Sequence, residues 1–368
     1  MKTIKRNILL NPGPATTTDT VKFAQVVPDI CPREEEFGNI MEYISSELTE
    51  LAGVSTDEYS SVLFGGSGTA AIEAVISSIT DENDCLLIIN NGAYGERMCQ
   101  IAKTYNINFV EYKSSALEPI DIYDLESVIK KEKLSYLLVV HSETTTGLLN
   151  DVQLLGALCE KHGIELVVDA MSSFAAIEIN LKKMNIKYLI ASSNKNLQGM
   201  AGVSFVIANK YSLEKIKHKT SKSYYLDLYA QYKYFSETKQ TRFTPPVQAM
   251  YALKQAIEET KSETIEARGK RYAGNWETLI KGLEELGLAY IVDKKYHSKI
   301  VTSIVEPDLS RYCFSDMHAF FKERGFTIYP GKIGDMNTFR IANIGAIDKN
   351  DMTEFLEHLN SYLISLQD

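Results

Sequence analysis

The hydrophobic pattern over the first two thirds of the chain alternates between short apolar runs and longer amphipathic stretches. The short runs are nearly continuous Val, Ile and Leu, which is typical of strands buried on both faces of a parallel sheet. Helical patterns separate them, for example at residues 69–80 and 95–105. Together they predict an α/β fold with a mostly parallel, seven-stranded sheet flanked by helices. The predicted strands are residues 61–64, 85–90, 108–112, 134–141, 164–169, 188–192 and 203–208.

The pattern changes toward the C-terminus. A long helical stretch from Pro246 to Leu283 could link two domains, and the 368 residues exceed the usual size of a single domain. Shorter and more mixed elements follow, which predict a smaller α+β domain. Its strands are expected at residues 289–292, 300–305, 327–329 and 339–341, and its helices near residues 315–324 and 349–366.

The net charge and the cysteines limit which partners and which cellular compartment we expect for this protein. The net charge of −9 argues against non-specific attraction to nucleic acid or to an acidic membrane surface. The apolar run at the N-terminus is too short for a signal peptide, and no stretch reaches the roughly 20 apolar residues that span a bilayer. The five cysteines are scattered and form no CxxC pair, so neither a disulfide framework nor a metal site is predicted. We therefore expect a cytoplasmic protein with small-molecule partners.

Two features lie at the ends of predicted strands, the edge at which α/β proteins bind ligands. The turn at residues 65–69, Gly-Gly-Ser-Gly-Thr, leads from a strand into a helix, whose N-terminal N–H groups suit a phosphate. The alternative is an ordinary capped turn without a ligand. Asp169 ends an apolar strand, where a carboxylate can keep a pyridine nitrogen protonated. The alternative for Asp169 is an N-cap of the segment that follows.

Two basic residues complete the candidate chemistry. Lys195 follows a strand and lies among small polar residues, and an amine near an electropositive cofactor can lose its proton and form a Schiff base. The alternative for Lys195 is a solvated surface charge. Arg340 lies inside an apolar strand, where we expect it to be buried and to need an anionic partner; its planar guanidinium suits a carboxylate or a phosphonate. The alternative for Arg340 is an internal salt bridge.

The order of these features resembles the class V, fold-type-I aminotransferases, which depend on pyridoxal 5′-phosphate (PLP). The interval between Asp169 and Lys195 also looks like the class V spacing. Within the family, the motif around Arg33 is most similar to that of enzymes of phosphonate catabolism that transfer the amino group of 2-aminoethylphosphonate to pyruvate. The segments that carry the resemblance are residues 11–15, 29–34 with Phe37, 91–97, 141–147, 168–174 and 193–199.

The resemblance implies a division of the chain and a role for each site residue. Residues 1–15 line the site, residues 16–255 form the large PLP-binding domain, and residues 256–368 form the linking helix and the small domain. Lys195 holds PLP covalently, and Asp169 pairs with the pyridine nitrogen. The other cofactor-binding residues are Ser67, Gly68, Thr69 and Asn194 at the phosphate, Tyr94 on the ring face, and Thr144 at the ring hydroxyl.

The resemblance also implies a homodimer with shared active sites. Thr244 would complete the phosphate site of the neighbouring subunit. Arg340 would bind the substrate carboxylate and also the phosphonate, while Asn11 and Gly13 would line the site. The substrates would be an amino donor and a 2-oxo acid.

Three other readings stay open. A transaminase of the same class could use alanine or serine with glyoxylate. A cysteine desulfurase needs a nucleophilic cysteine on a mobile loop, and Cys313 lies in no evident glycine-rich loop. A binding module that kept the fold without catalysis is the third, since a fold alone does not define a function.

Overall fold

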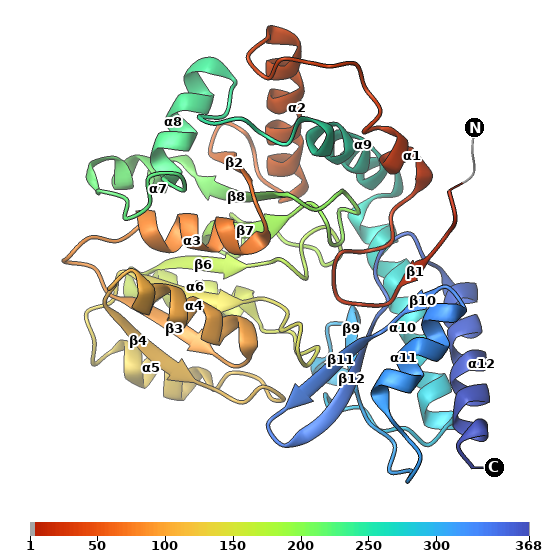
Figure 1. Ribbon diagram of the computed structural model, residues 1–368. Helices are drawn as coiled ribbons and strands as arrows, with labels where there is room; N and C mark the ends of the chain where they lie inside the picture. The colour runs from red at the N-terminus through yellow and green to blue at the C-terminus, as the bar shows by residue number, and fades with distance from the viewer. Residues whose placement is uncertain (1–3, 368) are drawn as a thin grey trace.

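The computed structural model describes residues 4–367, and its centre is a seven-stranded sheet (Figure 1). The spatial order is β2-β8-β7-β6-β5-β3-β4, and only β8 runs antiparallel to its two neighbours. The predicted mostly parallel sheet is therefore confirmed, and each predicted run forms one strand. The strands are β2 (Tyr59–Gly65), β3 (Leu86–Asn90), β4 (Phe109–Lys113), β5 (Tyr136–Val140), β6 (Glu165–Asp169), β7 (Ile186–Ser192) and β8 (Val203–Asn209).

The apolar runs are continuous because helices cover both faces of the sheet. Val139 and Val168 pack in one cluster with residues of α2, α6 and α9, whereas Leu138 and Val167 pack in a second cluster with α3 and α4. Successive side chains of a strand point to opposite faces, so each strand feeds both clusters. The helices of this part are α1 (Asp19–Phe23), α2 (Glu35–Leu51), α3 (Gly68–Ser78), α4 (Ala93–Thr104), α5 (Ile122–Ile129), α6 (Val152–His162), α7 (Lys210–Lys215), α8 (Leu228–Thr238) and α9 (Val247–Glu263).

The C-terminal part forms a smaller group of elements beside the sheet (Figure 1). Its three strands are antiparallel in the order β11-β12-β9, and β1 pairs in parallel with β10. Ile8 and Leu10 pack in the same cluster as Phe326, so the N-terminal segment joins the small part. The elements are β1 (Ile8–Leu9), α10 (Ile265–Glu285), β9 (Val301–Val305), α11 (Phe314–Glu323), β10 (Phe326–Thr327), β11 (Tyr329–Ile333), β12 (Met336–Ala342) and α12 (Lys349–Ser365).

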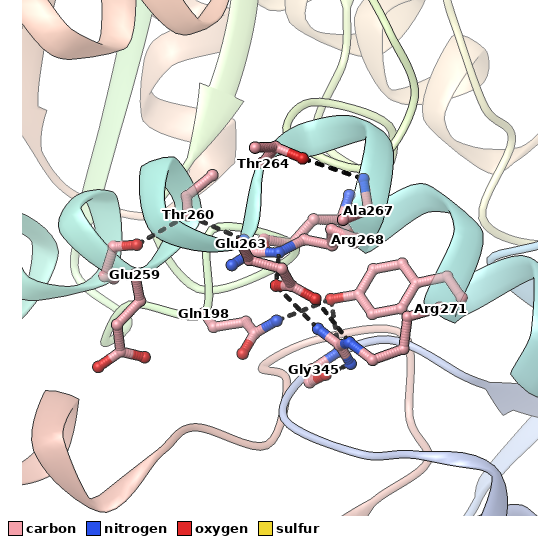
Figure 2. A network of polar contacts seen from close by, with 12 residues as sticks. Gln198, Glu259, Thr260, Glu263, Thr264, Ala267, Arg268, Arg271 and Gly345 are labelled. Atoms are coloured by element: carbon pink, nitrogen blue, oxygen red, sulfur yellow. Dashed lines mark hydrogen bonds and ion pairs between the residues drawn. The ribbon is translucent and has the colours of Figure 1, made fainter.

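Three predicted elements of this region are wrong. The strand expected at residues 327–329 is split at Ile328 between β10 and β11, which belong to different sheets. Residues 289–292 form no strand, because only Tyr290 makes a single bridge, to Ile304. The single helix from Pro246 to Leu283 is instead two helices, α9 and α10, which meet at Thr264 with φ of 69° and ψ of 148°. The Thr264 hydroxyl accepts a hydrogen bond of 3.2 Å from the N–H of Ala267 and so caps α10 (Figure 2).

The break at Thr264 lets the two helices pack on different cores. Met250 and Leu253 of α9 lie in a cluster of the large sheet, whereas Leu279 and Leu283 of α10 lie in the cluster of the small part. The helical period runs through the break, so the hydrophobic pattern alone carries no signal of it. Within residues 4–367, no helix is both long and apolar enough to cross a membrane.

Candidate active site

A cavity of about 350 Å³ lies where β7 ends and α3 begins. Its wall is built from the glycine-rich turn, the start of α4, and the segments on either side of Lys195. The lining residues are Gly66, Ser67, Gly68, Thr69, Ile72, Tyr94, Arg97, Met171, Ser192, Asn194, Lys195, Ala201 and Gly202. Six of the residues expected at the site, namely Ser67, Gly68, Thr69, Tyr94, Asn194 and Lys195, therefore share one cavity.

Lys195 is the cation at the centre of this cavity. Its Nζ donates a hydrogen bond of 2.9 Å to Ser172 Oγ and lies 5.6 Å from the centre of the Tyr94 ring. The N-terminal segment packs on its stem, since a Cβ on Gly13 would lie 3.2 Å from Lys195 Cε. Gly13 has a φ of 153°, a conformation that side chains rarely adopt, so glycine suits this contact.

The environment of Lys195 favours the neutral amine. Burial lowers the pKa of Lys195 from its ordinary value of 10.5 to about 8, although the nearby Asp169 and Glu143 carboxylates oppose this shift. A lysine with a pKa near 8 is partly unprotonated at neutral pH and is therefore a nucleophile and a base.

The lowered pKa of Lys195 leads to a prediction for the protein without cofactor. We expect an amine-acylating reagent to modify Lys195 with a half-maximal rate near pH 8. Ordinary exposed lysines should reach half-maximal rate about two units higher, because only the neutral amine reacts. Peptide mass spectrometry over a pH series measures both in one experiment. A midpoint for Lys195 that equals that of exposed lysines would contradict the prediction.

Asp169 is a buried carboxylate with one free oxygen. Its Oδ1 accepts a hydrogen bond of 2.9 Å from the N–H of Met171, so the N-cap interpretation accounts for one oxygen. Its Oδ2 is buried and has no partner among the residues that the structure describes. Burial raises the pKa of Asp169, and the Met171 hydrogen bond opposes that shift. A buried free oxygen of this kind requires a donor, which a protonated ring nitrogen supplies.

The glycine-rich turn also lines this cavity and offers hydrogen-bond donors to it. Ser67 is the N-cap of α3, yet its hydroxyl makes no capping hydrogen bond and is exposed. Gly68 and Thr69 are the first residues of α3, and N–H groups at this position have no partner within a helix. An anion at the turn would meet these N–H groups and the positive end of the helix dipole.

Thr144 reaches the site through a serine that the sequence analysis did not select. Thr144 Oγ1 and Ser172 Oγ lie 2.5 Å apart, and Ser172 also accepts the hydrogen bond from Lys195. Ser172 stands three residues after Asp169 in the motif at residues 168–174, which is the signal that could have identified it.

Glu143 is a second buried carboxylate that sequence reasoning missed. Its Oε1 accepts hydrogen bonds from the N–H and the hydroxyl of Thr145, at 3.0 and 2.6 Å, while Oε2 has no partner within residues 4–367. Its carboxyl group packs on the start of α4, because a Cβ on Gly92 would lie 2.4 Å from Glu143 Cδ. The burial of Glu143 could not be predicted from the sequence, because it depends on contact with Gly92, which is distant along the chain.

Arg340 is more exposed than its apolar strand predicted. Its side chain is half-exposed, and its guanidinium donates only to the backbone carbonyl of Pro330, at 3.0 and 3.3 Å. It lies over the Tyr329 ring and has no carboxylate partner in the described part of the chain. The internal salt bridge is therefore not formed, and the guanidinium remains free to bind an anion. Arg97, in the cavity itself, lies over the Tyr94 ring at 4.7 Å.

Two further expected residues, Asn11 and Thr244, do not line this cavity. Asn11 is buried, and its Nδ2 donates to the carbonyl of Pro14 at 3.1 Å. The following residue Ala15 donates its N–H to the carbonyl of Asn194, which ties the N-terminal segment to the lysine turn. Thr244 is exposed and shares a small hollow with Gly65, outside the cavity of its own chain.

The family of the chain follows from comparison with known proteins. The sequence model of the aminotransferase class-V family matches residues 20–345, and the chain belongs to this family. Among curated relatives, the 2-aminoethylphosphonate–pyruvate transaminase of Salmonella paratyphi B is 39% identical over 96% of this chain and 97% of its own length. The enzyme of the same name from Bacillus cytotoxicus is 37% identical over 97% of this chain and 98% of its own length.

Other relatives differ in length or in substrate. A bifunctional phosphonoacetaldehyde hydrolase/aminoethylphosphonate transaminase of Clostridioides difficile is 38% identical, and this chain spans only 56% of its length. Among solved structures, an alanine–glyoxylate aminotransferase from Nostoc sp. has a TM-score of 0.90 at 25% identity, with 98% of this chain and 96% of that chain covered. Pyridoxamine–pyruvate aminotransferase from Mesorhizobium loti, at 19% identity and a TM-score of 0.89, covers 100% of this chain and 94% of its own and shows the shared fold.

Class V aminotransferases use pyridoxal phosphate, which is therefore the cofactor of this chain. The observed residues fit it. The free Asp169 Oδ2 suits a protonated ring nitrogen, the turn around Gly68 suits the phosphate, and the neutral fraction of Lys195 suits the aldehyde.

Proposed function

We propose that the chain transfers the amino group of 2-aminoethylphosphonate to pyruvate, giving phosphonoacetaldehyde and alanine. The observation that carries the chemistry is the Lys195 amine, with its lowered pKa, near the unpaired buried oxygen of Asp169. The choice of substrates rests on the curated relatives, which match nearly the whole chain and carry this activity in their names.

Each residue of the site has a distinct task in this reaction. When bound, the cofactor supplies an electron sink for the donor carbon that carries the nitrogen. The free Oδ2 of Asp169 would accept a hydrogen bond from the ring nitrogen and so favour its protonated form. Lys195 Nζ would accept the proton from that carbon and hold it for return, which requires a pKa near the working pH. Ser172 Oγ accepts a hydrogen bond from Nζ and holds the amine in the cavity between these steps.

Binding of the substrates requires cations at the mouth of the site. Arg340 has only a backbone carbonyl as partner, so a carboxylate or phosphonate can take its hydrogen bonds without breaking an ion pair. The same guanidinium would then serve pyruvate in one half-reaction and the phosphonate in the other. Asn11 and Gly13 close the site from the N-terminal side.

A single-turnover mixing experiment tests the proposed function. The cofactor absorbance of the enzyme is followed after addition of 2-aminoethylphosphonate, alanine or serine. We expect fast conversion with 2-aminoethylphosphonate, and reversal by pyruvate. Conversion only with alanine or serine, and reversal by glyoxylate, would instead identify the other branch of the same class. Absence of any cofactor absorbance would contradict the enzyme assignment.

We further propose a homodimer in which Thr244 completes the phosphate site of the partner subunit. Thr244 is exposed and lies outside the cavity of its own chain, as a residue that acts across an interface must. Two exposed tyrosines lie nearby, since Tyr224 and Tyr225 pack on the ring of Phe243, the residue before Thr244. The free cysteines Cys31, Cys85, Cys99, Cys159 and Cys313 support the proposal that this dimer works in the reducing cytoplasm.

The shared site predicts that two inactive variants restore each other. Thr244→Asp places a carboxylate beside a phosphate dianion, and we expect it to lower activity by about 10²-fold through repulsion. Lys195→Ala is inactive for a different reason. Co-refolded in equal amounts, they should give about a quarter of the wild-type activity, because half of the dimers hold one intact site. Steady-state rates measure this effect.

The matched control is Thr238→Asp, an equally exposed position on α8, which should keep its activity. If the mixture of Thr244→Asp and Lys195→Ala stays inactive, or if the protein sediments as a monomer, the shared site is wrong.

A further inference from the structure

A fully buried arginine lies behind the turn that carries Lys195. Arg268, on α10, is 1% exposed, and its Nη1 donates hydrogen bonds to the carbonyl of Asn196, at 2.5 Å, and to Thr260 Oγ1, at 2.9 Å. Its Nε donates to the Glu263 carboxylate at 2.7 Å (Figure 2). Burying a guanidinium costs free energy, and Arg268 has no role in the proposed reaction itself. Its burial therefore needs another explanation.

The contact at Asn196 holds the lysine turn from its outer side. Asn196 directly follows Lys195, and its side-chain Nδ2 donates to the carbonyls of Ser172 and Phe174, at 2.9 and 3.0 Å. The turn is therefore fixed on one side to the segment that follows Asp169. The hydrogen bond from Arg268 fixes it on the other side, to the junction of α9 and α10.

Glu263 sets the orientation of Arg268. Its carboxylate also accepts hydrogen bonds from Arg271, at 2.7 and 3.1 Å. Burial tends to raise the pKa of Glu263, but the hydrogen bonds from Arg271 and Arg268 outweigh it, so the pKa is lowered. The carboxylate is therefore charged at neutral pH. The helix break at Thr264 brings the end of α9 into contact with the first turns of α10, which makes this triple contact possible (Figure 2).

Arg271 shares the Glu263 carboxylate but has different partners beyond it. Its Nη1 donates to the carbonyls of Gly345 and Ile347, both at 2.8 Å, and it makes no hydrogen bond to the lysine turn within residues 4–367. The two arginines therefore share the Glu263 carboxylate but bind different backbone segments. Arg268 supports the turn of Lys195, and Arg271 supports the loop before α12.

We propose that Arg268, oriented by Glu263, is a positioning residue for Lys195. It anchors the Asn196 carbonyl and so keeps the Lys195 amine, which lines the cavity and is partly exposed, beside Ser172 Oγ and close to Asp169. This inference rests on the proposed role of Lys195 as the residue that carries the cofactor. Without the anchor, the turn loosens and more water reaches the amine, which loses part of the burial that favours its neutral form.

The experiment compares four variants of the full chain: Arg268→Met, Arg268→Lys, Glu263→Gln and Arg271→Met. Met approximates the length of the arginine stem without its donors, and Lys restores the charge with fewer of them. The readout is the pH at which an amine-acylating reagent modifies Lys195 at half-maximal rate in the cofactor-free protein. Thermal unfolding midpoints are measured alongside, since every variant loses contacts.

We expect Arg268→Met to raise the midpoint of Lys195 by roughly half a pH unit or more, since loss of burial moves a lysine toward its ordinary pKa. Arg268→Lys should recover part of this shift. Arg271→Met should lower the unfolding temperature and leave the Lys195 midpoint unchanged, because it lacks the contact with Asn196. If Arg268→Met does not fold, Glu263→Gln, which keeps the side-chain size, should show a smaller shift in the same direction.

An unchanged Lys195 midpoint in the folded Arg268 and Glu263 variants, or an equal shift in Arg271→Met, would overturn the inference. The cofactor absorbance of the wild-type holoenzyme distinguishes failure of the proposed function from failure of the positioning role of Arg268. If the wild type binds no cofactor, the proposed function fails. If it binds cofactor normally and only the predicted shift is missing, the positioning role of Arg268 alone fails.

Discussion

Lys195→Ala is expected to lower the rate of the donor half-reaction by at least about 10⁴-fold, because it removes both the amine that holds the cofactor and the base that moves the proton. The variant loses no backbone hydrogen bond, and its side chain faces a cavity, so the fold should persist. The measurement is single-turnover absorbance after mixing with 2-aminoethylphosphonate.

Two further variants separate charge from proton transfer. Lys195→Arg keeps the positive charge but stays protonated at working pH, so we expect a loss as large as that of alanine. Lys182→Ala removes an exposed lysine paired with Glu58 and should keep the wild-type rate. A Lys195→Arg variant with a rate within about tenfold of wild type would show that the amine is not the base.

Asp169→Asn is the second large effect, with an expected fall of about 10²–10³-fold in the same rate, the range for losing one preorganised electrostatic partner. The amide has nearly the same size and can still accept the hydrogen bond from Met171. It cannot, however, supply the negative charge that keeps a ring nitrogen protonated. The rate is measured by single-turnover mixing, and the cofactor absorbance reports the protonation of the ring system.

Asp151→Asn provides the matched control for this substitution. Asp151 is the N-cap of α6 and accepts a hydrogen bond from the N–H of Leu154, away from the cavity around Lys195. Asn caps a helix about as well as Asp, so both stability and rate should stay close to wild type. An Asp169→Asn variant that retains a third or more of the wild-type rate would contradict the role of this carboxylate.

Residues that act at strand ends were the most predictable from the sequence. The seven apolar runs correctly predicted the strands, because a strand covered on both faces has no polar period to obscure it. Once the strands are known, Asp169 and Lys195 must lie near the same edge of the sheet, since Asp169 ends β6 and Lys195 follows the parallel neighbour β7. The common cavity of Ser67, Tyr94 and Lys195 agrees with that expectation.

Residues whose role depends on long-range packing were not predictable in the same way. Arg340 was expected to be buried because its strand is apolar, yet its side chain is only partly covered, whereas its neighbours Phe339 and Ile341 are buried. Glu143 is buried only because the backbone of Gly92 makes room for it. Neither the exposure of Arg340 nor the contact between Glu143 and Gly92 produces a periodic pattern or a fixed spacing that could be read from the sequence.

The α/β fold class, the order of the strands along the chain and the chemical groups at their ends were predictable from the residues alone, because they depend on local periodicity and on the geometry of a parallel sheet. The helix break at Thr264 and the contacts among Glu263, Arg268 and Arg271 became apparent only in the folded protein. The helical pattern continues through that break. Glu263, Arg268 and Arg271 are near neighbours in the chain, but the two arginines also donate hydrogen bonds to the distant carbonyls of Asn196 and Gly345. Side-chain partners of this kind follow from packing in three dimensions, which a one-dimensional pattern does not contain.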